Sequence, residues 1–74
     1  MAVRYIKLWK MLLDKRLKRT DLITIAGISA NVLARLGKDE YVALESLEKI
    51  CIALGCDIGD IVEIVNDSRL EDMT

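Results

Sequence analysis

The sequence predicts a single all-α domain of five helices. Three features support this fold class: 53% of the 74 residues are hydrophobic, proline is absent, and the apolar residues recur every three or four positions instead of alternating. A chain of this length forms one core, which must be packed efficiently to be stable. We expect the domain to span residues 1–66 and a frayed acidic tail to cover residues 67–74.

The first predicted helix covers residues 4–17. Tyr5, Leu8, Trp9 and Leu12 share one of its faces at helical spacing, which gives a broad apolar arc. Trp9 could serve either the core or a stacking contact with a ligand. We favour the core, because three other apolar residues share its face.

The next two predicted helices are short and lie close together in the sequence. They cover residues 21–26 and 30–37, and a tight turn at Gly27 separates them. Thr20 can cap the first of them through its hydroxyl, and Ser29 can cap the second. Gly27 ends the first helix, because the residue just after a helix often adopts the left-handed conformation that glycine reaches most easily.

The helix predicted over residues 30–37 has two faces of different chemistry. At about 100° per residue, one arc carries the apolar residues Val32, Leu33 and Leu36. The opposite arc carries small, polar and basic residues, namely Ala30, Asn31, Ala34, Arg35 and Lys38. Two capped helices joined by a glycine turn, with such an outer face on the second, are typical of a helix-turn-helix, whose second helix enters the major groove of DNA.

Two further helices are predicted downstream. One covers residues 44–54 and ends at Gly55, and the other starts at Asp57, which can cap it. The last helix would carry apolar residues at i, i+3, i+4 and i+7, namely Ile58, Ile61, Val62 and Val65. Ile52 and Ile64 fall outside the two apolar faces and are either isolated exposures or parts of a dimer interface.

The turn and the helix after it resemble a known family. Residues 27–36, GISANVLARL, are similar to the G-[IV]-S-x-x-x-[IL]-x-x-L core of Cro/cI-type (XRE-type) DNA-binding domains. Downstream, LEKICIALGC over residues 47–56 and GDI over residues 59–61 are similar to segments of the small stand-alone YozG-like members, and regulators of the VanU kind are similarly small. The resemblance covers about residues 6–65 and implies a compact five-helix lambda-repressor-like domain. Ile23 departs from the alanine usual in the family, so the two helices must separate slightly or repack.

The resemblance also implies which side chains meet DNA. It places Ser29, Ala30, Asn31, Ala34 and Arg35 toward the duplex. Asn31 can pair with adenine, and Arg35 can pair with guanine or hold a phosphate. Ala30 and Ala34 can touch a thymine methyl but cannot hydrogen-bond, so recognition would depend more on phosphates and DNA shape. The predicted phosphate contacts are Lys15, Lys18, Arg19, Thr20, Ser29 and Lys38.

The formal net charge of −1 conceals a strong asymmetry along the chain. Residues 1–38 contain nine Lys and Arg residues and two acidic residues, whereas residues 39–74 contain two Lys and Arg residues and ten acidic residues. The basic cluster KRLKR over residues 15–19 is either a solvated connection or, beside a helix-turn-helix, a contact to the DNA backbone, which we favour. One end of the domain can therefore face phosphates while the other faces away.

The residue inventory gives little support for catalysis or for a bound cofactor. The chain has no histidine, and Cys51 and Cys56 have no second pair to complete a metal site. We expect both cysteines to be buried, reduced thiols and not a disulfide or redox switch. We therefore predict no enzyme activity, metal, cofactor or small-molecule ligand.

These observations predict a sequence-specific duplex-DNA-binding transcriptional regulator that represses by occlusion, as a homodimer on a palindromic site. The alternative is a protein-interaction module, antitoxin-like or partner-binding, that retains the fold but binds DNA weakly. The two alanines on the outer face and the acidic half of the chain support that alternative. No apolar run approaches the ~20 residues that span a bilayer, and the basic start does not match a signal peptide, so we predict a cytoplasmic protein without membrane contact.

Overall fold

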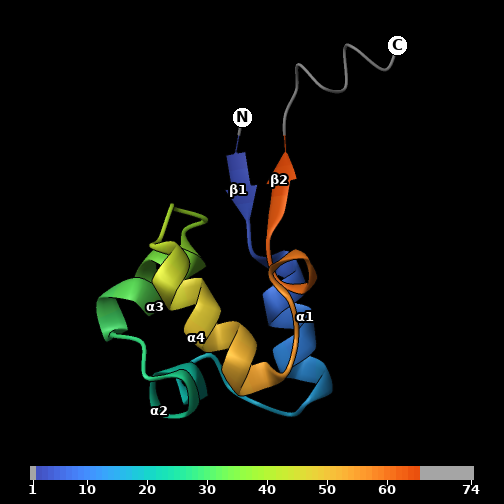
Figure 1. The fold of residues 1–74 in the computed structure, drawn as a ribbon, viewed down its shortest axis with the longest axis vertical. Helices are drawn as coiled ribbons and strands as arrows, with labels where there is room; N and C mark the ends of the chain where they lie inside the picture. The colour runs from blue at the N-terminus through green and yellow to red at the C-terminus, as the bar shows by residue number, and fades with distance from the viewer. Residues whose placement is uncertain (1, 66–74) are drawn as a thin grey trace.

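Four α-helices form the main body of the protein in a computed structural model that describes residues 2–65 (Figure 1). A short 3₁₀ helix and a two-stranded antiparallel sheet complete this part of the chain. In chain order the elements are β1 (Ala2–Arg4), α1 (Ile6–Asp14), α2 (Asp21–Ala26), α3 (Ala30–Gly37), α4 (Leu44–Leu54), η1 (Ile58–Asp60) and β2 (Glu63–Val65). The acidic tail predicted over residues 67–74 lies outside the described residues. None of the helices within residues 2–65 is long and apolar enough to span a bilayer.

The prediction of a fifth helix is wrong. The segment after α4 forms only the 3₁₀ helix η1 and then the strand β2, which pairs with β1 so that Val3 lies opposite Ile64. Gly59 weakens a helix at this point, and the sequence Glu63–Val65 ends in two β-branched residues that favour a strand. The helical spacing of the apolar residues could not reveal this outcome, because the pairing partner lies at the other end of the chain.

α1 is shorter than the predicted helix over residues 4–17. It begins later than predicted because Ala2–Arg4 pairs as a strand. At its other end Arg16 adopts a left-handed conformation with φ 58°, and the N–H of Leu17 donates to the carbonyl of Leu12 at 2.8 Å. This is the hydrogen bond of a Schellman-type helix ending, here formed without glycine.

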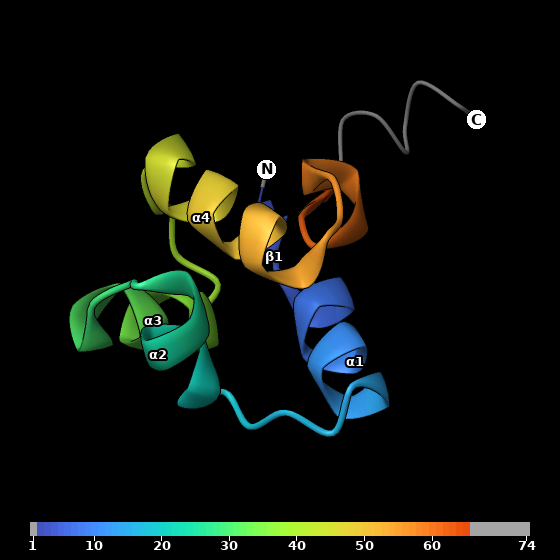
Figure 2. The same cartoon turned by 60° about the horizontal axis from the view of Figure 1, so that its bottom comes forward.

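α4 lies at the centre of the helical part. α1 lies on one side of α4, and α2 and α3 lie on the other side (Figures 1 and 2). Every α-helix and the segment after η1 contribute fully buried side chains, namely Leu8, Leu12, Leu22, Leu36, Ile50 and Ile61. Each such burial is worth about 1.5–3 kcal/mol, so this core fixes how α2 and α3 are presented.

Tyr5 joins the start of α1 to the loop that follows α3. Its backbone N–H donates to Oδ1 of Asp39 at 3.2 Å, and its hydroxyl donates to the carbonyl of Glu40 at 2.7 Å. Asp39 adopts a left-handed conformation with φ 56°. The sequence predicts Tyr5 only as a member of an apolar helix face, yet it also holds the C-terminal side of α3 in place.

We expect the Tyr5 hydroxyl to make stability depend on alkaline pH. Burial, followed by the nearby charge of Asp39, raises the pKa of Tyr5 above its ordinary value of 10.0. Because the folded protein holds this proton to a higher pH than the unfolded chain does, the stabilisation is fully present below about pH 10 and is lost as pH rises through the folded pKa. Urea denaturation at increasing pH should show a steeper alkaline decline for the wild type than for Tyr5→Phe. Parallel curves would contradict this role of Tyr5.

Gly27 should be intolerant of a side chain for conformational reasons. It has φ 72°, a left-handed conformation that L residues adopt at a cost, although nothing lies within 4 Å of the place of a Cβ. We expect Gly27→Ala to lower the free energy of unfolding by about 1 kcal/mol. The matched control is Gly59→Ala, because Gly59 also has open space but no left-handed φ. Thermal unfolding followed by circular dichroism should separate the two variants, and equal losses would contradict the argument.

Candidate nucleic-acid interface

The start of α2 is held by Asp21 and not by Thr20 as predicted. Thr20 has helical dihedral angles, φ −64° and ψ −23°, and within the described residues its side chain makes no capping hydrogen bond. Instead, the backbone N–H of Lys18 donates to Oδ2 of Asp21 at 2.8 Å. The chain therefore begins to turn two residues earlier than expected, since the N–H of Asp21 already donates to the carbonyl of Lys18 at 3.0 Å. Thr20 is exposed.

The turn between α2 and α3 agrees with the prediction. Gly27 ends α2 in the left-handed conformation, and its N–H donates to the carbonyl of Ile23. Ile28 is buried and anchors the turn to the core. The Oγ of Ser29 then accepts from the backbone N–H of Val32 at 3.1 Å, which confirms Ser29 as the cap of α3. Ile23, the departure from the family pattern, is half-buried and packs against the core.

The two faces of α3 are those that the sequence predicts. Leu36 is fully buried, and Val32 and Leu33 are half-buried against the core. The outer face consists of exposed residues, namely Ala30, Asn31, Ala34 and Arg35, and exposed Lys38 follows as the cap residue after α3. The predicted base-contacting side chains therefore lie on one solvent-facing surface.

The cations around this surface are exposed and are not neutralised by neighbouring acids. Within residues 2–65 the structure contains a single ion pair, between Lys49 Nζ and Glu45 Oε1 at 3.8 Å, both on α4. In the described part of the chain no carboxylate partner is therefore found for the basic residues of the predicted interface. These residues are Lys15, Lys18, Arg19, Arg35 and Lys38. Such cations remain available to an anionic ligand.

Arg19 is oriented by Trp9. The Cζ of Arg19 lies 4.0 Å from the centre of the Trp9 ring, which is a cation–π contact. Trp9 is half-buried, so it packs against the core as predicted but keeps this further contact. The Nη1 of Arg19 is also 3.7 Å from the position that a Cβ on Gly37 would occupy. Arg19 therefore lies between α1 and the end of α3, an arrangement that sequence spacing could not reveal.

The remaining polar groups do not form an alternative site of known type. No group of three His, Cys, Asp or Glu residues in the described part could hold a metal ion. Cys51 and Cys56 are free thiols, but they are half-buried and not buried as predicted. They line a hollow of about 530 Å³ beside α4, away from the outer face of α3.

The predicted caps of α2 and α3, Thr20 and Ser29, should contribute differently to the free energy of unfolding. Ser29→Ala removes a hydrogen bond to an otherwise unpaired helix N–H and should cost about 1 kcal/mol of unfolding free energy. Thr20→Ala removes no capping bond and should be close to neutral. Urea denaturation of the two variants measures both values. A larger loss for Thr20→Ala than for Ser29→Ala would contradict this assignment of the caps.

This arrangement defines a helix-turn-helix protein whose second helix presents a small, polar and cationic face. A family model of the Cro/C1-type HTH DNA-binding domain matches residues 7–67, and the chain belongs to this family. Among solved structures, the crystal structure of the transcriptional regulator VanUg is similar, with 45% sequence identity and a TM-score of 0.83. The match covers 86% of this chain and 85% of that chain. No curated protein matches the chain.

Proposed function

We propose that this protein is a sequence-specific regulator of transcription that binds duplex DNA and represses by occluding its site. The observation that carries the proposal is the exposed outer face of α3, capped by Ser29 and surrounded by cations without acidic partners in the described residues. The 45% identity to VanUg, a transcriptional regulator, supports the same assignment. A protein bound at a promoter through such a face would block access by the transcription machinery.

In this proposal α3 enters the major groove and reads few bases directly. Asn31 would pair with an adenine, and Arg35 would pair with a guanine or hold a phosphate. Ala30 and Ala34 would contact thymine methyl groups, since their side chains offer no hydrogen bond. Specificity would therefore depend partly on the shape and deformability of the site.

The proposed phosphate contacts come from the segment before α2 and from the end of α3. Lys15, Lys18 and Arg19 precede α2, and Lys38 follows α3. The guanidinium of Arg19 is already fixed over Trp9, so less conformational entropy is lost when it binds a phosphate. Thr20 does not use its hydroxyl as a cap in the described structure, and the Oγ of Ser29 accepts from Val32, so both hydroxyls can donate to phosphate oxygens.

The proposal is tested by fluorescence anisotropy with a labelled duplex from the protein's own upstream region and a pool of random duplexes. Four or five phosphate contacts should give a slope of log affinity against log salt of roughly −4. Arg35→Ala and Asn31→Ala should each weaken binding to the upstream duplex by about 1–3 kcal/mol and reduce its advantage over the pool. Lys49→Ala is the matched control, because Lys49 lies on α4 and is paired with Glu45.

Two results would overturn the proposal. One is the absence of binding to either duplex at low salt, which would favour the protein-interaction alternative. The other is an equal loss of affinity for Lys49→Ala and Arg35→Ala, which would show that binding does not use α3.

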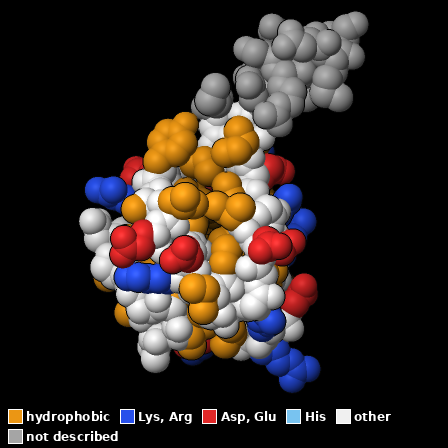
Figure 3. All heavy atoms as spheres, in the orientation of Figure 1, with side chains coloured by type: hydrophobic (Ala, Val, Ile, Leu, Met, Phe, Trp, Pro, Cys, Tyr) orange, Lys and Arg blue, Asp and Glu red, His pale blue; other side chains and the backbone are white. Residues whose placement is uncertain are grey.

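We further propose that the protein acts as a homodimer on a palindromic site. Figure 3 shows hydrophobic side chains gathered on the face that presents α4 and the segment after it. Leu44, at the start of α4, and Ile58, in η1, are 68% and 43% exposed and line one hollow of about 300 Å³. Burial of such residues against a second copy would stabilise the dimer, and two-fold symmetry would place the α3 helices about one DNA turn apart.

A pair of leucine variants tests the dimer. Leu44→Glu should convert the dimer to a monomer and weaken binding to the upstream duplex at least about tenfold, because a single half-site is then bound. Leu13→Glu is the matched control, since Leu13 is 76% exposed but lies on α1. Analytical ultracentrifugation gives the oligomeric state. A wild-type monomer, or dimers that survive Leu44→Glu, would contradict this interface.

A further inference from the structure

The two cysteines of the chain are brought together by the way α4 ends. Residues five apart in a continuing helix point about 140° away from each other. Here Gly55 turns the chain with φ 67°, and the N–H of Cys56 donates to the carbonyl of Cys51 at 3.0 Å. This bond is that of a Schellman ending, in which the side chains of the two bonded residues commonly touch.

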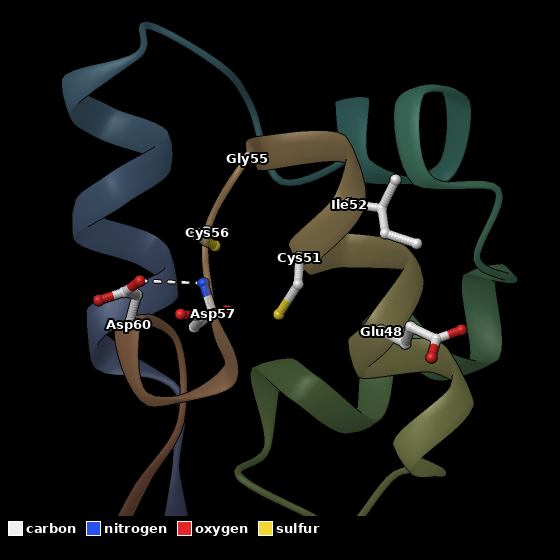
Figure 4. A pocket seen from close by; sticks show the side chains of 7 residues that line it. All are labelled: Glu48, Cys51, Ile52, Gly55, Cys56, Asp57 and Asp60. Carbon is white, nitrogen blue, oxygen red and sulfur yellow. Dashed lines mark hydrogen bonds between the residues drawn. The ribbon is translucent and has the colours of Figure 1, made fainter.

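Cys51 and Cys56 line one hollow at the surface. Figure 4 shows the side chain of Cys51 pointing from α4 into a hollow that the segment carrying Cys56 and Asp57 borders. Both residues are half-buried, and both line this hollow of about 530 Å³. Burial raises the pKa of the Cys51 thiol, and its interaction with the Cys56 thiol raises it further.

We propose that Cys51 and Cys56 form a reversible modification site, at which the two thiols close to an intramolecular disulfide. The helix ending holds the two residues one backbone hydrogen bond apart, and the proposal is that rotation of the two side chains closes the bond. The thiols are the only two in the chain, so no other intramolecular pairing can compete.

Formation of the disulfide needs a two-electron oxidant, and a neutral azo compound of the diamide type can supply this role. One thiolate adds to the N=N bond, and the second thiolate attacks that sulfur to form the S–S bond and release the hydrazine. The two thiols lose two electrons and two protons, and the oxidant gains them. Glu48, Asp57 and Asp60 line the same hollow, so a neutral oxidant should be preferred over an anionic one such as glutathione disulfide.

The two cysteines can do more than supply the side-chain packing contact at the end of α4. Any two apolar side chains could supply the contact that accompanies a Schellman ending. A thiol pair that is half-exposed beside an open hollow can also be reached by a small oxidant. Because the raised pKa of Cys51 keeps its thiolate fraction low, the reactivity of the pair depends on this access. Cys51 and Cys56 also line the hollow of Leu44 and Ile58, so the dimer proposed above would cover the thiols, and the oxidant would reach them in the monomer.

The experiment treats the full-length, reduced protein with diamide at low protein concentration and measures intact mass and free thiols. The expected product is a monomer lighter by two hydrogen atoms, with both thiols lost together and restored by dithiothreitol. Cys51→Ser and Cys56→Ser should give no such product and should instead form cross-linked dimers. Circular dichroism of each variant checks that it remains folded.

Two outcomes would overturn the inference. One is formation of intermolecular dimers, or retention of both thiols, by the wild type under conditions that oxidise a reference dithiol. The other comes from redox equilibration of the native and the urea-unfolded chain. The native fold should favour the disulfide by about tenfold, or about 30 mV for this two-electron couple. A native pair harder to oxidise than the unfolded pair would show that the fold holds the sulfurs apart.

Discussion

The turn from Gly27 to Ser29 determines what the rest of the structure presents. Gly27 reverses the chain in the left-handed conformation, Ile28 is buried, and the Ser29 hydroxyl oxygen holds the first turn of α3. Leu36 then packs α3 into the core, so its opposite face must point to solvent. A change in this turn would redirect the outer face of α3 without touching any of its exposed residues.

Local signals in the sequence were sufficient for this central region. The bounds of α2, α3 and α4, the left-handed Gly27 and Gly55, and the Ser29 cap all follow from residues within one or two turns of each other. The same reasoning was wrong for Thr20, because the N–H groups of Leu22 and Ile23 already donate to the carbonyls of Arg19 and Thr20, and Asp21 holds the N–H of Lys18.

The features that sequence reasoning missed depend on residues far apart in the chain. β2 exists because the first residues of the chain offer it a partner strand, where spacing alone favoured a helix. Tyr5 reaches Asp39 and Glu40, and Arg19 reaches Trp9, through contacts with no periodic signature. The contacts of Tyr5 and of Arg19 connect α1 to the two ends of the helix-turn-helix. α1 therefore supports the surface that we propose binds DNA.

Backbone amide NMR during titration with duplex DNA would test most directly the claim that the outer face of α3 binds DNA. Our account predicts that chemical-shift changes concentrate on the exposed residues of α3 and on residues 15–20, with α4 and η1 little affected except for the dimer contacts. Shift changes confined to the acidic hollow beside α4, or none at all at low salt, would contradict the account.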